Sequence, residues 1–118
     1  MLGETVKAWK VFLETGDILQ SAFVGSPGKV YYPRHATWRR DSSTQGPAAC
    51  FRTKERAKQF KARMQGGLPL ASVSRFVMLP VRISLSRENL LWYKCCGQTY
   101  RAYEWPKGTV FADSVTVP

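Results

Sequence analysis

The sequence predicts an α+β fold in which a curled antiparallel sheet of about five to seven strands carries one amphipathic helix. Most of the chain falls into short runs that alternate apolar and polar residues, which is the period of a strand. Residues 53–67 instead repeat apolar side chains at helical spacing. The chain has 118 residues, of which 44% are hydrophobic and 22% are charged, so we expect a single domain spanning residues 1–118.

Three strands are expected in the first third of the chain. Residues 6–13 (VKAWKVFL) alternate, and the turn formers Gly16 and Asp17 separate them from a second strand at residues 18–24. A short third strand, residues 29–32, follows a Ser-Pro-Gly turn.

Residues 33–49 are expected to form an irregular loop. They are polar and rich in turn formers, and the segment is long enough to be functional. It carries three arginines and one tryptophan that are candidates for contact with a ligand, namely Arg34, Arg39, Arg40 and Trp38.

One amphipathic helix of about three turns is expected next. Thr53 is a suitable N-cap, because its hydroxyl can accept a hydrogen bond from a free N–H of the first turn. Ala57, Phe60 and Met64 then recur on one face, and the glycine pair 66–67 marks the end of the helix.

The remainder of the chain reads as strand, at residues 76–85, 90–96, 99–105 and 108–117. The middle two runs form a candidate hairpin, which Gly97 and Gln98 would join in a type II′ turn. That register makes four cross-strand pairs, which are Cys96 with Thr99, Lys94 with Arg101, Trp92 with Tyr103, and Leu90 with Trp105.

Positive charge is concentrated in the middle of the chain. Between Lys29 and Arg63 the sequence places ten basic residues against only Asp41 and Glu55, so most of the formal net charge of +10 lies there. Mutual repulsion in such a block favours an anionic partner, such as nucleic acid, a nucleotide or an acidic protein. The alternative is a basic surface that has no charged ligand.

The start of the predicted helix is the first candidate site. Arg52, Lys54 and Arg56 crowd an end where the helix dipole is already positive, and Glu55 alone has the preferred sign. A phosphate or carboxylate bound to the free backbone N–H groups would relieve this conflict. Arg63 follows on the same flank of the helix as the two arginines. The competing interpretation is that these long side chains cover the edge of the core and keep their charged heads in water.

The predicted hairpin is the second candidate site. Lys94 facing Arg101 across the two strands is unfavourable by itself. Beside Trp92 and Tyr103, however, the same pair could bind a base by stacking and its phosphate by charge. The alternative is that the aromatic residues are ordinary core residues and that the cations lie at the rim of the sheet.

The sequence carries no signature of an enzyme. It contains no phosphate-binding, dinucleotide-binding, zinc-protease or nucleophile-elbow motif. The single histidine, His35, has no recognisable nucleophile or acidic partner, and Glu88, Glu104 and Asp113 are isolated along the chain. We therefore expect a non-enzymatic protein without a cofactor.

The cysteines predict neither a metal site nor a disulfide framework. Cys50, Cys95 and Cys96 lack the spacing of zinc ligands, and neighbouring residues on a strand point to opposite faces. No apolar run approaches the ~18 residues of a membrane span, and residues 1–15 lack the apolar core of a signal peptide. These features predict a cytoplasmic protein without a membrane partner.

The order of several short motifs resembles that of small uncharacterised bacterial and phage accessory proteins. The motifs are AWKVF, SAF and VYY, then the strand-to-helix element CFRTKERAKQF, and a terminal GTVFADSVTV. The resemblance covers most of the chain in outline and implies a compact stand-alone domain from a phage or mobile element. Such proteins often act by binding and blocking host factors, and the resemblance implies no catalytic residue.

The first hypothesis is a non-enzymatic protein that binds an anionic, phosphate-bearing ligand, either nucleic acid or a nucleotide signal, as a phage inhibitor or sponge of host defence. The alternative is an inhibitor that covers an acidic or nucleic-acid-binding surface of a host protein. A small nucleotide-modifying enzyme that uses His35 or Glu104 is a third candidate. The predicted ligand contacts are Arg34, Trp38, Arg39, Arg40, Arg52, Lys54, Arg56, Arg63, Trp92, Lys94, Arg101 and Tyr103.

Overall fold

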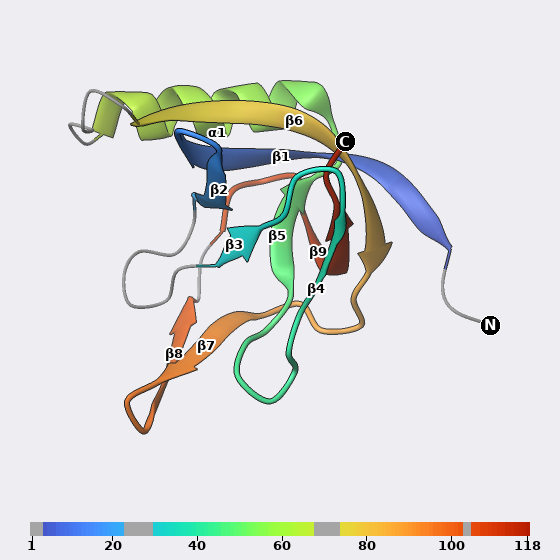
Figure 1. Cartoon of the computed structure of the whole chain (residues 1–118), viewed down its shortest axis with the longest axis vertical. Helices are drawn as coiled ribbons and strands as arrows, with labels where there is room; N and C mark the ends of the chain where they lie inside the picture. The colour runs from blue at the N-terminus through green and yellow to red at the C-terminus, as the bar shows by residue number, and fades with distance from the viewer. Residues whose placement is uncertain (1–3, 23–29, 68–73, 103–104) are drawn as a thin grey trace.

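A computed structural model describes residues 4–22, 30–67, 74–102 and 105–118, and it confirms the predicted α+β fold with a curled antiparallel sheet (Figure 1). These residues form nine strands and one helix, α1 (Lys54–Gly67). The strands are β1 (Thr5–Thr15), β2 (Ile18–Ser21), β3 (Tyr31–Tyr32), β4 (Thr37–Arg39), β5 (Ala48–Phe51), β6 (Ser74–Leu85), β7 (Leu91–Cys95), β8 (Gln98–Ala102) and β9 (Thr109–Thr116).

Four strands close the main sheet into a ring. β1 pairs with β6 along its whole length, β6 pairs with β9, β9 pairs with β5, and β5 returns to β1 through the pair Trp9 and Phe51. All of these pairs are antiparallel, and a bulge between Ser84 and Leu85 adds curvature to β6. β2 and β3 extend the sheet beyond β1, and β4 pairs with β9, which gives the strand order β3-β2-β1-β5-β9-β4. The closed ring has an inner and an outer face.

The two faces of the ring build two cores, because successive residues of a strand point to opposite sides. The inner core includes the buried side chains of Ala8, Phe12, Ile83 and Val115. The outer core lies under α1, which covers β1, β5 and β6 (Figure 1). Its buried members are Val11, Phe51, Ala57, Phe60 and Phe76.

The helix begins and ends as the sequence predicts. The backbone N–H of Arg56 donates a hydrogen bond of 3.3 Å to Oγ1 of Thr53, which makes Thr53 the N-cap. Ala57 and Phe60 are buried against the sheet, and Met64 packs at the edge of the same core. The predicted apolar face and the helix end at residues 66–67 are therefore confirmed.

The prediction of an irregular loop at residues 33–49 was wrong in part. β4 lies within this range, and β5 begins inside it. All four residues of β5 are buried, so the strand has no alternation of apolar and polar residues by which a sequence pattern would reveal it. β2 and β3 are also shorter than predicted, while residues 23–29 fall outside the described part of the chain.

The predicted register of the β7–β8 hairpin was wrong by two residues. Its turn residues are Cys96 and Gly97, not Gly97 and Gln98, because Cys95 pairs with Gln98. Both turn residues have positive φ, 58° and 79°. Positive φ at both central positions suits a type I′ turn, whose twist matches that of the flanking strands.

This register removes the predicted opposition of like charges. Lys94 pairs with Thr99 and not with Arg101. Trp92 pairs with Arg101 and not with Tyr103. Tyr103 lies outside the described residues, and Trp105 lies beyond the end of β8. The hairpin projects from the main sheet at the end of the molecule away from α1 (Figure 1).

One lysine is buried in the inner face of the ring. Lys10 on β1 is 1% exposed, and its Nζ donates a hydrogen bond of 2.7 Å to the backbone oxygen of Ala49. The same nitrogen lies 5.6 Å from the ring centroid of Phe12 and 5.0 Å from that of Tyr32. Burial lowers the pKa of Lys10, and this loss of hydration outweighs the electrostatic influence of Cys50, which raises it.

Candidate functional site

Cations from three parts of the chain meet around the start of α1. Arg52 follows β5, Lys54 and Arg56 stand in the first turn of α1, Lys7 comes from β1, and Arg82 comes from β6. We call these five residues the basic cluster. Their positions are linked by three sets of contacts, which involve the ring of Trp9, the β1–β6 ladder and the turn before β9.

The ring of Trp9 joins β1 to the helix. Nζ of Lys7 lies 5.2 Å from the centroid of this ring, and Nζ of Lys54 lies 5.5 Å from it. The negative face of an indole attracts cations, and an exposed contact of this kind contributes about 0.5–1 kcal/mol. Trp9 therefore holds two exposed ammonium groups near each other without neutralising either charge.

Arg82 is brought to the cluster by the pairing of β1 with β6. Lys7 and Arg82 are directly opposite each other in this antiparallel ladder. Their side chains point to the same face, and like charges in directly opposed positions destabilise a sheet. Both residues are exposed, so an anion can reach them from solvent.

The two arginines of the cluster pack against the turn before β9. The backbone N–H of Arg52 donates a hydrogen bond of 3.1 Å to the oxygen of Gly108. Gly108 has a φ of +88°, and a Cβ atom at this position would lie 2.6 Å from Cγ of Arg56. Glycine thus allows both the turn and the close packing of the stem of Arg56, whose Nη1 donates a hydrogen bond of 3.3 Å to Oε1 of Gln59.

The positive charge of the cluster has no acidic counterpart in the described structure. Among the described residues, Glu14 pairs with Arg34 and Arg75. Arg40 pairs with Glu88 and Asp113, so no ion pair of these residues involves the basic cluster. Glu55 is the one acidic residue of α1, and the helix dipole adds positive potential at this end. The arrangement can bind an anion, which would relieve repulsion among the cations.

Two open clefts adjoin the cluster. Lys7 and Arg52 line one of about 110 Å³, whereas Lys7 and Arg82 line a more open one of about 320 Å³. The smaller cleft is well below the ~300–1,000 Å³ of a typical small-molecule pocket, and the larger one is at the lower limit of that range but is open to solvent. The site is therefore a basic surface with two hollows and not a closed pocket.

Other predicted contact residues support the fold. Arg34 forms an ion pair with Glu14, and its Nε donates a hydrogen bond of 3.2 Å to the backbone oxygen of Asp17. Glu14 also accepts a hydrogen bond of 2.6 Å from Arg75, and this bond together with that from Arg34 lowers the pKa of the Glu14 carboxyl group. Trp38 packs against the inner core, where its ring centroid lies 5.0 Å from that of Tyr32.

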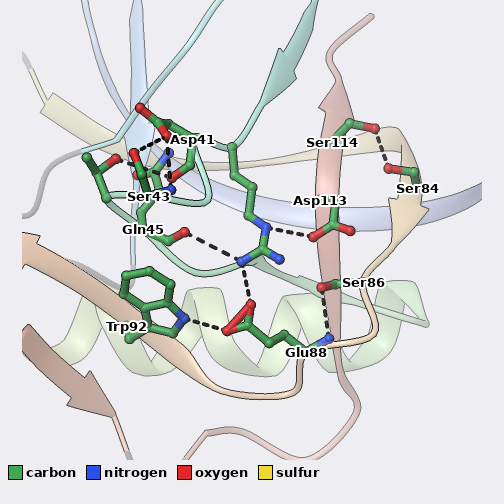
Figure 2. A network of polar contacts seen from close by, with 11 residues as sticks. Asp41, Ser43, Gln45, Ser84, Ser86, Glu88, Trp92, Asp113 and Ser114 are labelled. Atoms are coloured by element: carbon green, nitrogen blue, oxygen red, sulfur yellow. Dashed lines mark hydrogen bonds and ion pairs between the residues drawn. The ribbon is translucent and has the colours of Figure 1, made fainter.

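The side chain of Arg40 forms ion pairs with Glu88, which precedes the hairpin, and with Asp113 on β9, and Figure 2 labels both acids in this polar network. The Arg40 side chain is 13% exposed, and it lies 2.7 Å from Oε2 of Glu88 and 2.8 Å from Oδ1 of Asp113. Nε1 of Trp92 donates a hydrogen bond of 2.6 Å to the other oxygen of Glu88. This bond and the one from Arg40 lower the pKa of Glu88. Arg40 and Trp92 are thus engaged in holding the fold together.

The remaining predicted residues do not form one surface with the basic cluster. Arg39 is exposed on β4, and Arg63 lies in the third turn of α1, away from its start. Lys94 and Arg101 are exposed on the hairpin, at the far end of the molecule from α1 (Figure 1). Of the twelve predicted contacts, the structure brings together Arg52, Lys54 and Arg56 at the helix start.

Sequence reasoning missed Lys7, Trp9 and Arg82. A signal for the first two was present, because the alternation of residues 6–13 places Lys7 on the same side as Trp9. No local pattern identifies Arg82, since its place beside Lys7 depends on a ladder between segments about 75 residues apart.

The described residues contain no group of three or more His, Cys, Asp or Glu side chains that is arranged to hold a metal ion. His35 is exposed and has a positive φ of 57°, as a residue in a tight turn can. No helix in the described ranges is both long and apolar enough to span a membrane.

Comparisons with models of protein families, with curated protein sequences and with solved structures found no match for this chain.

Proposed function

We propose that this protein binds a phosphate-bearing ligand at the basic cluster, without catalysis, and that the ligand is the backbone of a nucleic acid. The observation that carries the proposal is the group of five cations around the start of α1, which has no ion-pair partner among the described residues. Arginine binds phosphate in bidentate fashion and lysine binds it as a point charge, so the cluster offers both modes.

The shape of the site favours a polymer over a small nucleotide signal. The cations are spread over β1, β6 and α1, and the clefts between them are open. Several phosphates in a row can contact such a surface at once, whereas a single nucleotide would meet only part of it. Each phosphate that is neutralised releases condensed counterions, and this release supplies much of the affinity.

The wider role that we propose is an inhibitor or sponge in the cytoplasm, encoded by a phage and directed at host defence. A protein that occupies phosphates without cutting or modifying the ligand acts by withholding it from other proteins. Cys50 is buried as a free thiol, which suits a reducing compartment.

Fluorescence anisotropy of a labelled single strand tests the proposal. The double variant Lys7→Gln and Lys54→Gln removes two exposed charges and leaves the arginine packing at Gly108 intact. We expect it to bind more weakly, and the slope of log K against log salt to become shallower by about 1.4, because each lost phosphate contact is worth about 0.7 on a single strand.

The matched control is Lys94→Gln with Arg101→Gln on the hairpin, which lowers the net charge by the same amount. This control should keep the affinity and the salt slope close to those of the wild-type protein. Equal losses in both double variants would show that net charge acts without a site, which contradicts the proposal. A stoichiometric complex with an acidic host protein on gel filtration, with the labelled strand left free, would favour the protein-inhibitor alternative.

A further inference from the structure

The ring of β1, β6, β9 and β5 is incompletely closed near the start of α1. On the edge of β1 that faces away from β6, β2 pairs with residues 12–15 and β5 pairs with Trp9. Within the described ranges, no strand pairs with residues 5–8 of β1 on that edge. The main-chain N–H and C=O groups that point outward there therefore have no partner in the sheet.

A small apolar cleft of about 110 Å³ lies along this gap, with walls from β1, β6 and β9. Its apolar lining consists of Val6, Ala8, Ile83, Leu85 and Val110. Val6 is 38% exposed and Leu85 is 53% exposed, whereas Ala8 and Ile83 are at most 1% exposed, so a ligand would meet chiefly Val6 and Leu85 at the open mouth of the cleft. The space is smaller than the cavity of ~150 Å³ that holds benzene, so it admits the edge of a ring and not a whole ring.

Two members of the basic cluster complete the lining of this cleft. Lys7 on β1 and Arg52 at the end of β5 border the cleft, and neither belongs to an ion pair of the described residues. Nζ of Lys7 lies over the ring of Trp9, beside the mouth of the cleft and not inside it. An apolar hollow, two cations without such an ion pair and an unpaired strand edge thus lie next to one another. They fit a ligand that has one flat ring with a polar edge and a phosphate close to it.

We infer that the mouth of the cleft receives the edge of one base of a single-stranded nucleic acid while the adjoining phosphate binds Lys7 and Arg52. This inference rests on the proposed function and names the substrate class of the same site. The ring of the base packs against the exposed side chains of Val6 and Leu85, and its polar edge meets the unpaired main-chain groups of residues 5–8. A duplex would first have to unpair and unstack that base, so the site favours a single strand.

Two strands with the same number of phosphates test the assignment. The first is an oligothymidine of about ten nucleotides, which is within the usual site size, and the second is its abasic counterpart. Wild-type protein should bind the abasic strand about tenfold more weakly, because one base contact is lost. The salt slope should be the same for both strands, since their phosphates are equal in number.

The variant Leu85→Ser removes part of the apolar lining at an exposed position. We expect its affinity for oligothymidine to fall to the wild-type level for the abasic strand, while its affinity for the abasic strand stays unchanged. The matched control is Ile18→Ser on β2, because Ile18 is another exposed aliphatic residue, at 54%, and does not line the cleft. This control should bind both strands as the wild-type protein does.

The outcomes separate this inference from the proposed function. Equal wild-type affinities for the intact and abasic strands would overturn base insertion and leave phosphate binding standing. The cleft would then suit another occupant, such as an aliphatic side chain of an acidic protein. Failure of both strands to bind at low salt would overturn the proposed function, and the inference with it.

Discussion

Lys10 is a lysine in a place where most proteins put an aliphatic residue. Its nitrogen donates a hydrogen bond to the Ala49 oxygen and lies near the rings of Phe12 and Tyr32, and no ion pair of the described residues includes it. The neutral amine keeps the hydrogen bond and avoids the cost of a buried charge, which is why burial lowers its pKa. The stability of the inner core should therefore depend on the protonation of Lys10.

We expect the variant Lys10→Met to separate this effect from other titrations. A lysine in the unfolded chain holds its proton up to about pH 10.5, whereas folded Lys10 releases its proton at a lower pH. Between these two pKa values the unfolded state binds more protons, so the free energy of unfolding of the wild-type protein rises with pH. Urea unfolding should be measured for both proteins at several alkaline pH values below 10.5. The free energy of unfolding of the wild-type protein should rise with pH more steeply than that of the variant. Parallel curves would mean that Lys10 keeps an ordinary pKa.

Gly108 determines how closely the helix start approaches the β9 turn. An alanine there must adopt a φ of +88° and place its Cβ 2.6 Å from Cγ of Arg56, so Gly108→Ala should destabilise the protein by about 1–3 kcal/mol. The control is Gly66→Ala, because a Cβ at this helical position meets nothing within 4 Å. It should stabilise the protein by about 0.5–1 kcal/mol in the same urea titration. Equal effects of the two substitutions would contradict the close approach at Gly108.

At the scale of elements, local sequence patterns predicted the helix and strands whose two faces lie in different environments. α1 has a capping threonine and an apolar stripe, and β1 and β6 alternate because each separates the two cores. β5 could not be found in this way, since all four of its residues are buried. β4 is too short for any period to appear, and it becomes a strand through its pairing with β9.

The hairpin shows how turn chemistry can mislead. A Gly in the first turn position favoured a type II′ turn at Gly97 and Gln98, whereas the structure places Cys96 in a left-handed conformation that non-glycine residues rarely adopt. Gly46 and Lys94 donate backbone hydrogen bonds, both of 2.7 Å, to the oxygens of Trp92 and Thr44, so β7 is held against the 41–46 segment. In the observed register Tyr93 lies opposite Tyr100, and their rings stack with centroids 5.0 Å apart.

At the scale of the molecule, the candidate site is a product of ring closure. Arg52, Lys54 and Arg56 are neighbours in sequence, so their common position was predictable from charge and the helix start. Lys7 and Arg82 join them because β1 and β6 are adjacent in the ring. Both strands contribute side chains to the inner and the outer core, and this packing favours their pairing. The charge block seen in the sequence therefore contains cations that are paired within the fold, such as Arg34 and Arg40, together with three members of the basic cluster, which form no ion pair among the described residues.

Repulsion in the basic cluster should also be measurable in the stability of the whole molecule. The double variant Lys7→Gln and Lys54→Gln loses the contacts with Trp9 as well as the repulsion, so we expect the repulsion to appear in the salt dependence of its stability. Added chloride should raise the Tm of the wild-type protein more than that of this variant, because the Debye length falls to about 8 Å at physiological salt. The hairpin variant Lys94→Gln with Arg101→Gln should keep a salt response closer to that of the wild-type protein, since Lys94 faces Thr99 and Arg101 faces Trp92 rather than each other.

Inorganic pyrophosphate distinguishes specific anion binding from screening in the same melting experiment. At constant ionic strength it should raise the Tm of the wild-type and hairpin-variant proteins, because a ligand that binds the folded state stabilises it by mass action. The variant without Lys7 and Lys54 should respond less, having lost two of the cations that would hold the anion. If pyrophosphate and chloride of equal ionic strength act alike on all three proteins, the cluster screens charge but binds no phosphate.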